Sequence, residues 1–384
     1  MGPLQGKRII ELGGVGPAPF CGMLFADMGA EVILVERKTR NPNDIGLTSP
    51  DAARFSIVRR GKRSIAVDLK KVGAGDAIMR LVRECDGLIE GFRPGVMERL
   101  GLGPEECLRA NPGLVYGRLS GWGQEGPLAS AAGHDLNYVA LSGALYYSGC
   151  RNTPPSVPPT LVGDICGGAM MLAVGMLGAM LSAGGSGKGQ IVDAAITDGS
   201  ALATALLYGL HAQGLWGNER GANFLDGGSH WYGSYECADG EYISIAALEP
   251  KFYKLLIDKL GLIDEPAFAD QHDRCRWQQS KQRFGEIFKT RTRDEWCDVL
   301  EGTDACFAPV LNFSEAPEHP HNKARRSFMS VAGVTQPAPA PRFSATPSEV
   351  SAPPPGIGEH AESILGLAGY SQSEIAALRE QQVI

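Results

Sequence analysis

The sequence lacks the residue patterns by which common metal and disulfide sites are recognised. Its nine cysteines are an odd number, no two of them are spaced as CxxC, and neither an HExxH nor an EF-hand pattern is present. We therefore expect no bound metal ion. Scattered cysteines without a pairing pattern are typical of proteins in a reducing compartment, so we expect the protein to be cytoplasmic.

Long hydrophobic runs and targeting signals are also lacking. The longest apolar run, Ala169–Ala183, is shorter than the ~20 residues that a bilayer-spanning helix needs, and it is interrupted by glycine. It predicts a buried helix in a protein that does not associate with membranes. The chain begins without a charged segment followed by an apolar one, and its last residues do not form a peroxisomal SKL-type signal.

An excess of positive charge is the third missing feature. Lysine and arginine number 36 against 43 aspartate and glutamate residues, which gives a net charge of −7, and no long stretch is strongly basic. This balance disfavours a nucleic-acid partner. With 384 residues, of which 43% are hydrophobic, the chain is long enough for two or three domains with buried cores.

Short apolar strands alternate with helices over the first 194 residues. This alternation indicates an α/β fold with a doubly wound, largely parallel sheet of Rossmann-like type. The predicted strands are Lys7–Leu12, Glu31–Val35, Ser64–Leu69, Gly87–Glu90, Leu114–Leu119 and Gln190–Ala194, and the predicted helices among them include Ala18–Met28, Ala74–Glu84 and Pro104–Ala110.

A second, smaller α+β domain is predicted by the change of composition at the glycine-rich stretch Gly221–Gly233. It begins with a hairpin over Tyr235–Ala247 that turns at Asp239 and Gly240. We place the large domain at residues 1–215, completed by residues 330–384, and the small domain at residues 216–329. Helices are expected at Asp198–Leu215, Lys251–Leu260, Gln278–Thr290 and Asp294–Leu300, with two short helices within Glu359–Gln382.

The turn after the first strand does not fit a dinucleotide-binding fingerprint. Gly14 and Gly16 supply the first two glycines of GxGxxG, but Pro19 stands where the third is needed for close helix packing. A nicotinamide-dependent dehydrogenase is therefore disfavoured. A basic cluster at residues 59–63 could hold a pyrophosphate through charge-assisted hydrogen bonds, and the alternative is a solvated loop.

His134 and Asp164 are the two titratable side chains with the most suggestive surroundings. Each follows a glycine and opens an apolar run, and a proline-rich segment that cannot be helical lies between the two runs. If the runs are helices, both groups lie at positive helix N-termini, which suits proton transfer beside a developing negative charge. The alternatives are a structural histidine and a plain N-cap aspartate.

Glu249 precedes Pro250 at the predicted start of a helix in the small domain. A carboxylate at that place could serve only as a helix-end charge. It could also orient a histidine from across an interface and raise the basicity of its imidazole.

Taken together, the motifs of the chain resemble the family III CoA-transferase superfamily, and within it the α-methylacyl-CoA racemase branch. The resemblance covers nearly the whole chain. It rests on LQGKRIIELGGVGPAPFCGMLFADMGAEVILVER (Leu4–Arg37), RRGKRSIAVDLK (Arg59–Lys70), EGFRPGVMERLGLGPEE (Glu90–Glu106), GRLSGWGQEGP (Gly117–Pro127), AGHDLNY (Ala132–Tyr138), LVGDICGG (Leu161–Gly168), GKGQIVDAAITDG (Gly187–Gly199) and YECADGEYI (Tyr235–Ile243).

The resemblance implies an interlocked, ring-shaped homodimer and an acyl-CoA substrate, with no cofactor apart from the CoA that belongs to the substrate. The site is expected between the large domain of one subunit and the small domain of the other. The residues that match the CoA-binding positions are Arg37, Val67, Asp68, Leu69, Lys70, Gly91, Phe92, Arg93, Arg99, Gly133, Asp135, Leu136, Asn137 and Tyr138.

His134 decides between the branches of the superfamily. Transferases usually have an aromatic residue there and asparagine in place of Gly91, and their aspartate that matches Asp164 forms an acyl-enzyme. A racemase instead needs one base for each face of the α-carbon. The resemblance assigns the S substrate to His134 and the R substrate to Asp164, with Glu249 of the partner subunit holding His134.

We accordingly expect interconversion of (2R)- and (2S)-2-methylacyl-CoA through an enolate-like intermediate. Its oxygen is expected to be stabilised by the backbone N–H of Asp164 and the helix that follows. CoA transfer through Asp164 is the main alternative. A CoA-thioester-binding protein without catalytic activity is a further one.

Overall fold

The computed structural model describes residues 2–39 and 50–384 and divides into two compact units. The first unit comprises Met1–Ser142, Pro158–Ala203 and Arg326–Ile384, and the second comprises Gly143–Val157 and Thr204–Arg325. The sequence prediction placed the boundaries at residues 215 and 330 and kept residues 143–157 in the large domain. Each unit has its own hydrophobic core.

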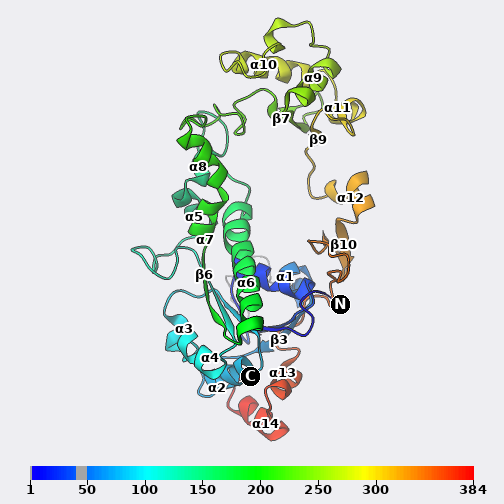
Figure 1. The fold of residues 1–384 in the computed structure, drawn as a ribbon. Helices are drawn as coiled ribbons and strands as arrows, with labels where there is room; N and C mark the ends of the chain where they lie inside the picture. The colour runs from blue at the N-terminus through cyan, green and yellow to red at the C-terminus, as the bar shows by residue number, and fades with distance from the viewer. Residues whose placement is uncertain (1, 40–49) are drawn as a thin grey trace. The chain divides into compact units, whose positions relative to one another are not determined.

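The first unit is built on a parallel six-stranded sheet with the order β3-β2-β1-β4-β5-β6. Its two edge strands, β3 and β6, are labelled in Figure 1. All five strand pairs run parallel, so the predicted α/β class is confirmed. The strands are β1 (Arg8–Leu12), β2 (Glu31–Glu36), β3 (Lys62–Ala66), β4 (Gly87–Glu90), β5 (Val115–Ser120) and β6 (Gln190–Ala195).

Helices cover both faces of this sheet, as parallel strands buried on both sides require. One face packs against α1, α6 and α7 through residues such as Ile9 and Val32, and the other packs against α2, α4, α13 and α14 through neighbours such as Ile10 and Ile33. The helices of this unit are α1 (Pro17–Asp27), α2 (Ala74–Arg83), α3 (Val96–Arg99), α4 (Pro104–Ala110), α5 (Asp135–Ser142), α6 (Met171–Ser186), α7 (Ile196–Ala203), α13 (Ala361–Leu367) and α14 (Gln372–Glu380).

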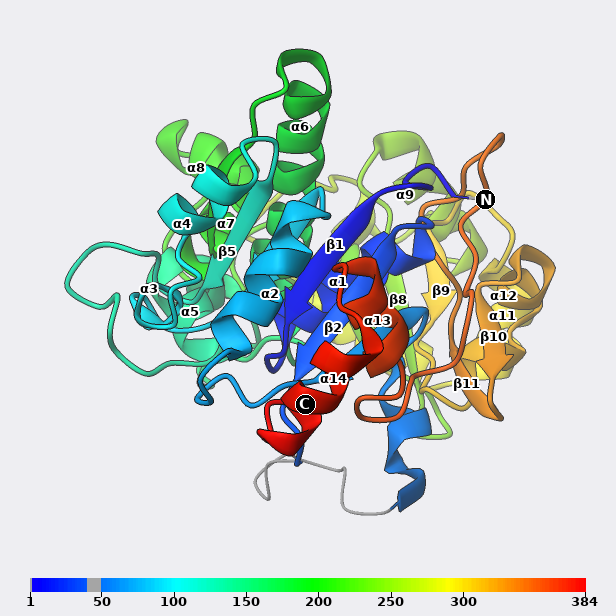
Figure 2. The ribbon, with the colours of Figure 1, turned by 90° about the horizontal axis from the view of Figure 1, so that it is seen from below.

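The C-terminal segment returns to the first unit and covers the exposed edge of its sheet. The N–H of Gly61 donates to the carbonyl of Ala352 at 2.9 Å, and the N–H of His360 donates to the carbonyl of Ser64 at 2.9 Å. These bonds satisfy backbone groups of β3 and of the residue just before it, which an edge strand would otherwise expose. Helices α13 and α14 then complete the core on one face of the sheet (Figure 2).

The apolar helix after the proline-rich loop is longer than predicted. It is continuous over Leu161–Ser186, 26 residues that are long and apolar enough to cross a membrane by length and composition alone. One side of the helix carries Leu172 and Met176, which are fully buried against the sheet. The other side leaves Val174 at 62% and Leu181 at 82% exposure.

The prediction of one long helix over Asp198–Leu215 is wrong, because the helix is interrupted. The structure has two helices there, α7 and α8 (Ala205–Ala212), with a break at Thr204, where the chain passes from the first unit to the second. Periodicity alone did not reveal this break, because Thr204 lies within an otherwise uninterrupted apolar pattern.

The second unit contains a three-stranded antiparallel sheet with the order β7-β8-β9 and a core rich in aromatic rings. The predicted hairpin is confirmed, with Gly240 in the left-handed region at a φ of 82°. The unit also contains β7 (Tyr232–Glu236), β8 (Tyr242–Ala246), β9 (Phe307–Pro309), α9 (Pro250–Lys259), α10 (Trp277–Phe288), α11 (Arg293–Leu300) and α12 (Pro320–Arg325). A separate hairpin, β10 (Phe328–Val331) and β11 (Val334–Pro337), belongs to the first unit and was not predicted.

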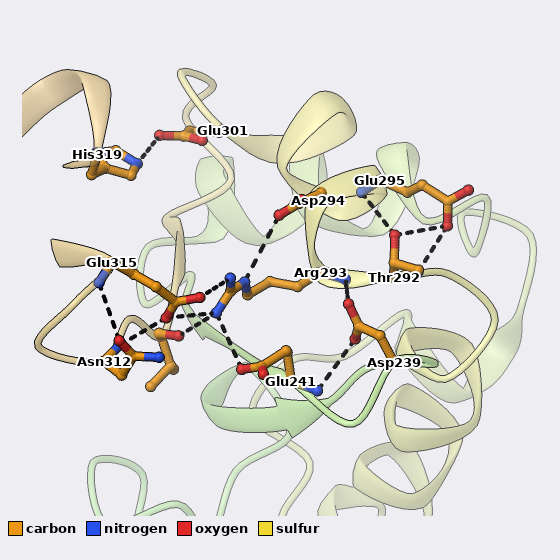
Figure 3. A network of polar contacts seen from close by, with 11 residues as sticks. Asp239, Glu241, Thr292, Arg293, Asp294, Glu295, Glu301, Asn312, Glu315 and His319 are labelled. Carbon is orange, nitrogen blue, oxygen red and sulfur yellow. Dashed lines mark hydrogen bonds and ion pairs between the residues drawn. The ribbon is translucent and has the colours of Figure 1, made fainter.

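Arg293 connects the hairpin turn, α11 and the segment before α12 (Figure 3). Its guanidinium pairs with Glu315 at 2.5 Å and with Glu241 at 3.2 Å, and its backbone N–H donates to Asp239 at 3.1 Å. The preceding Thr292 forms a capping box with α11. This network stabilises the second unit and accounts for the local charges without invoking a ligand.

Candidate active site

The candidate site lies at the C-terminal edge of the six-stranded sheet. From β1 the chain leads to α1 on one face, and from neighbouring β4 it leads toward α4 on the other face. Such a switch point is where open α/β sheets bind ligands. The two loops that meet there are residues 13–16 after β1 and residues 91–95 after β4.

His134 immediately precedes α5, as predicted. Its backbone N–H donates to the side-chain Oδ1 of Asn137 at 3.1 Å, and its carbonyl accepts the N–H of Asn137 at 2.8 Å. This reciprocal contact fixes the N-terminus of the helix while the imidazole stays exposed. The ring is therefore accessible to a substrate.

Asp164 lies in the first turn of its helix rather than at the N-cap that the sequence predicted. The helix begins at Leu161, after Thr160 in a left-handed conformation, and its first ten residues form a π-helix. A π-helical turn leaves one more N–H group unpaired than an α-helical turn, and such turns are frequent at functional sites. Asp164 thus lies among free backbone donors and is only partly buried.

A hydrogen bond links the two predicted catalytic segments. The carboxylate Oδ1 of Asp135, the residue after His134, accepts the backbone N–H of Asp164 at 2.8 Å. A side chain at Gly163 would clash with this carboxylate, because its Cβ would lie 2.4 Å from Oδ1. Sequence reasoning assigned Asp135 only to CoA binding and missed this link, although the paired Gly-His-Asp and Gly-Asp motifs contain all its residues.

The hydrogen bond between Asp164 and Asp135 changes the expected position of the oxyanion site. Since the N–H of Asp164 is bonded to Asp135, it is not free to stabilise an enolate oxygen. The backbone N–H groups of Asp135 and Leu136, at the start of α5, have no hydrogen-bond partner among residues 2–39 and 50–384. The available donors near the site therefore include those at the N-terminus of α5, one helix away from the predicted position.

Burial and a neighbouring charge raise the pKa of Asp164. Desolvation, with a smaller contribution from the Asp135 carboxylate, raises the pKa of Asp164 to about 6, against an opposing effect of His134. A carboxyl group with a pKa near neutrality can both take and return a proton.

Close backbone contacts hold the helix that carries Asp164. A Cβ on Gly199 in α7 would lie 1.9 Å from the carbonyl oxygen of Gly167, and one on Gly167 would lie 2.5 Å from the Oγ of Ser200. On the other side, the Cβ position of Gly16 is 3.4 Å from Asp164 Oδ2, so the glycine loop after β1 reaches the Asp164 carboxylate. Gly167 and Gly199 allow contacts that any side chain would prevent.

The predicted CoA-binding segment 133–138 is held by two aromatic rings. The hydroxyl of Tyr138 donates to the carbonyl of Gly133, and its ring packs edge-on against Trp122 with centroids 4.7 Å apart. A Cβ on Gly121 would overlap the Tyr138 ring. Tyr138 is thus buried and held in place, whereas Leu136 and Asn137 are exposed.

The other predicted CoA-binding residues follow β2, β3 and β4 at the same edge of the sheet. Among them, Val67 is buried in the core, and the carboxylate of Asp68 accepts the N–H of Lys70 at 3.1 Å. The partly exposed or exposed members of the set are Arg37, Asp68, Leu69, Lys70, Gly91, Phe92, Arg93 and Arg99. Four of these carry positive charge, which suits a phosphate-bearing ligand.

The basic cluster at residues 59–63 does not form a pyrophosphate site. Arg60 makes a buried, two-point contact with Asp27 at 2.6 and 3.0 Å, and Lys62 pairs with Glu11 in the core. The guanidinium groups of Arg59 and Arg63 pair with Glu36 and Glu31. These cations are engaged within the fold, so neither alternative considered for the sequence, phosphate binding or solvation, describes them.

Glu249 belongs to the second unit and precedes α9 as its N-cap residue. Its side chain makes no capping hydrogen bond and is exposed. The carboxylate is therefore available to another group. Within residues 2–39 and 50–384, no cluster of three or more His, Cys, Asp or Glu side chains is arranged to hold a metal ion.

A comparison with known families agrees with these features. The profile of CoA-transferase family III matches residues 4–361, which is most of the sequence. The chain belongs to CoA-transferase family III. Its glycine loop, His134 segment and Asp164 helix all lie within the matched region.

Two similar members of family III are alpha-methylacyl-CoA racemases from Mus musculus and Homo sapiens. Each is 42% identical to this chain, and each alignment covers 99% of this chain and 97% of the relative. Among solved structures, a CaiB/BaiF family protein from Brucella suis superposes with a TM-score of 0.81 at 26% identity, covering 96% of this chain and 99% of that one. The predicted family and the predicted α/β fold class are thus confirmed.

Proposed function

We propose that this family III protein interconverts (2R)- and (2S)-2-methylacyl-CoA thioesters by a 1,1-proton transfer. The observation that carries the proposal is the hydrogen bond between Asp135 and Asp164, because it joins the segments of the two acid/base groups. The 42% identity with racemases along the full chain supports the same reaction. The enzyme is accordingly an isomerase.

In the proposed mechanism, one base removes the α-proton and the other returns a proton to the opposite face. Asp164 takes the proton from the R substrate, and His134 takes it from the S substrate. The pKa of Asp164, raised to about 6 by burial and by Asp135, lets the same carboxyl serve as base and as acid. No covalent intermediate is needed.

The negative charge that develops on the thioester oxygen requires donors. The free N–H groups of Asp135 and Leu136 at the start of α5 are suited to this task, since the helix dipole adds to their effect. This arrangement replaces the donor expected from the sequence, the N–H of Asp164. It also places the donors in the segment that precedes the predicted CoA-binding Tyr138.

CoA itself is proposed to bind along the C-terminal edge of the sheet. The residues assigned to it follow strands β2, β3 and β4 or begin α5, and the exposed cations among them supply charge for phosphate groups. Bound CoA belongs to the substrate, so no separate cofactor is proposed. We also propose a cytoplasmic location, in line with nine free cysteines.

We further propose that the active unit is a homodimer in which Glu249 of the partner subunit holds His134. The carboxylate of Glu249 makes no capping hydrogen bond and is exposed, which supports this role. The exposed apolar side of α6, with Val174 and Leu181, supports burial against a second copy of the chain rather than in a membrane. The buried side of the same helix is part of the core of the sheet.

The test is α-proton exchange in D₂O. The purified protein is incubated with (2S)-2-methylacyl-CoA, and deuterium at Cα is measured together with optical purity. We expect both deuterium incorporation and racemisation, and protein that gives neither refutes the proposal. A panel of bile-acid, branched fatty-acyl and arylpropionyl thioesters then identifies the preferred acyl group.

CoA transfer is the second candidate, because Asp164 matches the nucleophile of family III transferases. It predicts an acyl-aspartyl intermediate that hydroxylamine traps during turnover. Mass spectrometry of the peptide containing Asp164 then shows a hydroxamate. Exchange without a trapped adduct favours the racemase.

A further inference from the structure

Arg118 bonds to both ends of the loop that follows β4. Its Nε donates to Glu90 Oε1 at 2.9 Å, and its Nη1 donates to Glu98 Oε1 at 2.8 Å. Glu90 is the last residue of β4 and Glu98 belongs to α3, so the loop Gly91–Gly95 lies between the two carboxylates. The guanidinium of Arg118 thus binds the residues at both ends of the loop.

The same contacts fix the backbone inside the loop. The second carboxylate oxygen of Glu90 accepts the N–H of Phe92 at 2.8 Å, which leaves Glu90 with a partner on each oxygen. Gly91 lies against α1, where a Cβ would be 3.3 Å from that of Ala18. Strand pairing adds a third constraint, because Glu90 and Arg118 are partners in the parallel register of β4 and β5.

This charged pair is nearly inaccessible to water. The side chain of Glu90 is 1% exposed and that of Arg118 is 9% exposed. Buried ion pairs contribute little to stability compared with well-packed apolar residues, because both charges lose their hydration. The pair at the end of β4 is therefore better explained by the geometry that it imposes than by the stability that it supplies.

The loop held in this way contains residues assigned above to CoA. Gly91, Phe92 and Arg93 lie within it, and Arg99 ends α3, directly after Glu98. The Cβ position of Gly95 is 3.2 Å from Nη1 of Arg99, so this exposed guanidinium lies over the turn. Displacement of the loop would move these groups together.

We propose that Arg118, acting through Glu90 and Glu98, is a positioning residue that sets the affinity of the protein for CoA. The inference rests on the proposed binding of CoA by the loop after β4. Arg118 itself does not contact the reacting atoms. Its removal should therefore change binding much more than the chemical step.

The experiment measures the Kd of CoA alone by titration calorimetry and KM and kcat by α-proton exchange. We expect Arg118→Met to raise Kd and KM by about 10- to 100-fold, because the loop is no longer held in register, with kcat nearly unchanged. Glu98→Gln should raise Kd by only about two- to fivefold, because Glu98 is half-exposed and its ion pair with Arg118 is weak. The buried pair of Arg118 with Glu90 stays intact in this variant.

Arg60→Met is the matched control. Arg60 is also a buried arginine that makes two hydrogen bonds to carboxylate oxygens, but it lies before the edge strand β3, whereas Arg118 lies in β5. Arg60→Met should lower the melting temperature by about as much as Arg118→Met does, and it should leave the Kd of CoA within about twofold of the wild-type value. A purely structural role of Arg118 predicts the same result for both arginine variants.

Three outcomes overturn the inference: an equal rise in Kd for both arginine variants, an unchanged Kd for Arg118→Met, or no CoA binding by the wild type. If Arg118→Met does not fold, an unchanged Kd for Glu98→Gln overturns it instead. A wild-type protein that binds CoA but shows no exchange refutes the racemase and leaves this comparison intact.

Discussion

The carboxylate of Asp135 accepts the backbone N–H of Asp164 at 2.8 Å and places its negative charge near the carboxyl group of Asp164. Asp135 thus has two effects on Asp164. The hydrogen bond fixes the position of Asp164, and the charge helps burial to raise the pKa of Asp164 to about 6. The two effects can be separated by a substitution that removes only the charge.

Asp135→Asn is expected to shift the pH profile of the reaction. In the direction where Asp164 acts as the base, kcat/KM should rise with pH through about 6 in the wild type, because only the ionised carboxylate accepts a proton. The asparagine keeps an oxygen acceptor for the N–H but removes the neighbouring charge, so the rising limb should move to lower pH. Rates with the R substrate between pH 5 and 8 test this, and an unmoved limb contradicts it.

His134→Ala and Asp164→Asn are expected to abolish racemisation nearly completely. A positioned acid/base group typically contributes ~10²–10⁴-fold, and each direction of the proposed mechanism uses both groups. Loss of optical purity, followed by chiral chromatography, measures the effect. Binding of CoA alone should persist in both variants, which separates a catalytic defect from misfolding.

Gly199→Ala tests the close contact behind Asp164. The new methyl group would lie 1.9 Å from the carbonyl oxygen of Gly167, so the helix must move. We expect a loss of about 1–3 kcal/mol in the free energy of unfolding and a lower kcat, because overpacking displaces the neighbouring backbone. Gly366→Ala in α13 is the control, since its Cβ meets no atom within 4 Å, and it should leave kcat unchanged.

His230 in the second unit predicts acid sensitivity that is unrelated to catalysis. The ring is 1% exposed, its Nε2 lies 2.8 Å from the hydroxyl of Tyr253, and burial lowers its pKa to about 4. Below pH 6.5 the unfolded chain binds a proton that the folded protein excludes. Stability should therefore fall by about 3 kcal/mol as the pH drops from 6.5 to 4, and then level off.

Unfolding of the protein in denaturant at several pH values, followed by the fluorescence of the second unit, measures this loss. His230→Phe should remove the slope between pH 6.5 and 4, because phenylalanine cannot be protonated. The hydroxyl of Tyr253 keeps its bond to the carbonyl of Phe268 in this variant. An equal slope in wild type and variant assigns the acid sensitivity to other groups.

Much of the fold could be predicted from local patterns. The strands of the six-stranded sheet are continuous apolar runs bounded by turns, and Gly87–Glu90 is predicted to the residue. The hairpin was recognisable from its Asp-Gly turn. The break at Thr204 and the hairpin β10–β11 were not recognised, because neither carries a strong turn signal.

The sequence named the residues of the candidate site but not the contacts that connect them. His134 and Asp164 were identified from motifs, but the hydrogen bond of Asp164 to Asp135 joins residues 29 positions apart. Likewise, Arg60 and Lys62 resemble a phosphate site in sequence, and only the fold brings Asp27 and Glu11 to them. Pairing across a fold is decided by topology, which a local pattern does not encode.

The glycines around Asp164 also limit how this protein can be redesigned. At residues 163, 167 and 199, even a methyl group would overlap another atom, so randomising these codons in a library would yield mostly inactive clones. Diversity is better directed to exposed positions such as Leu136, whose side chain is 52% exposed. New acyl preferences are thus more readily sought at the rim of the site than in the backbone beneath it.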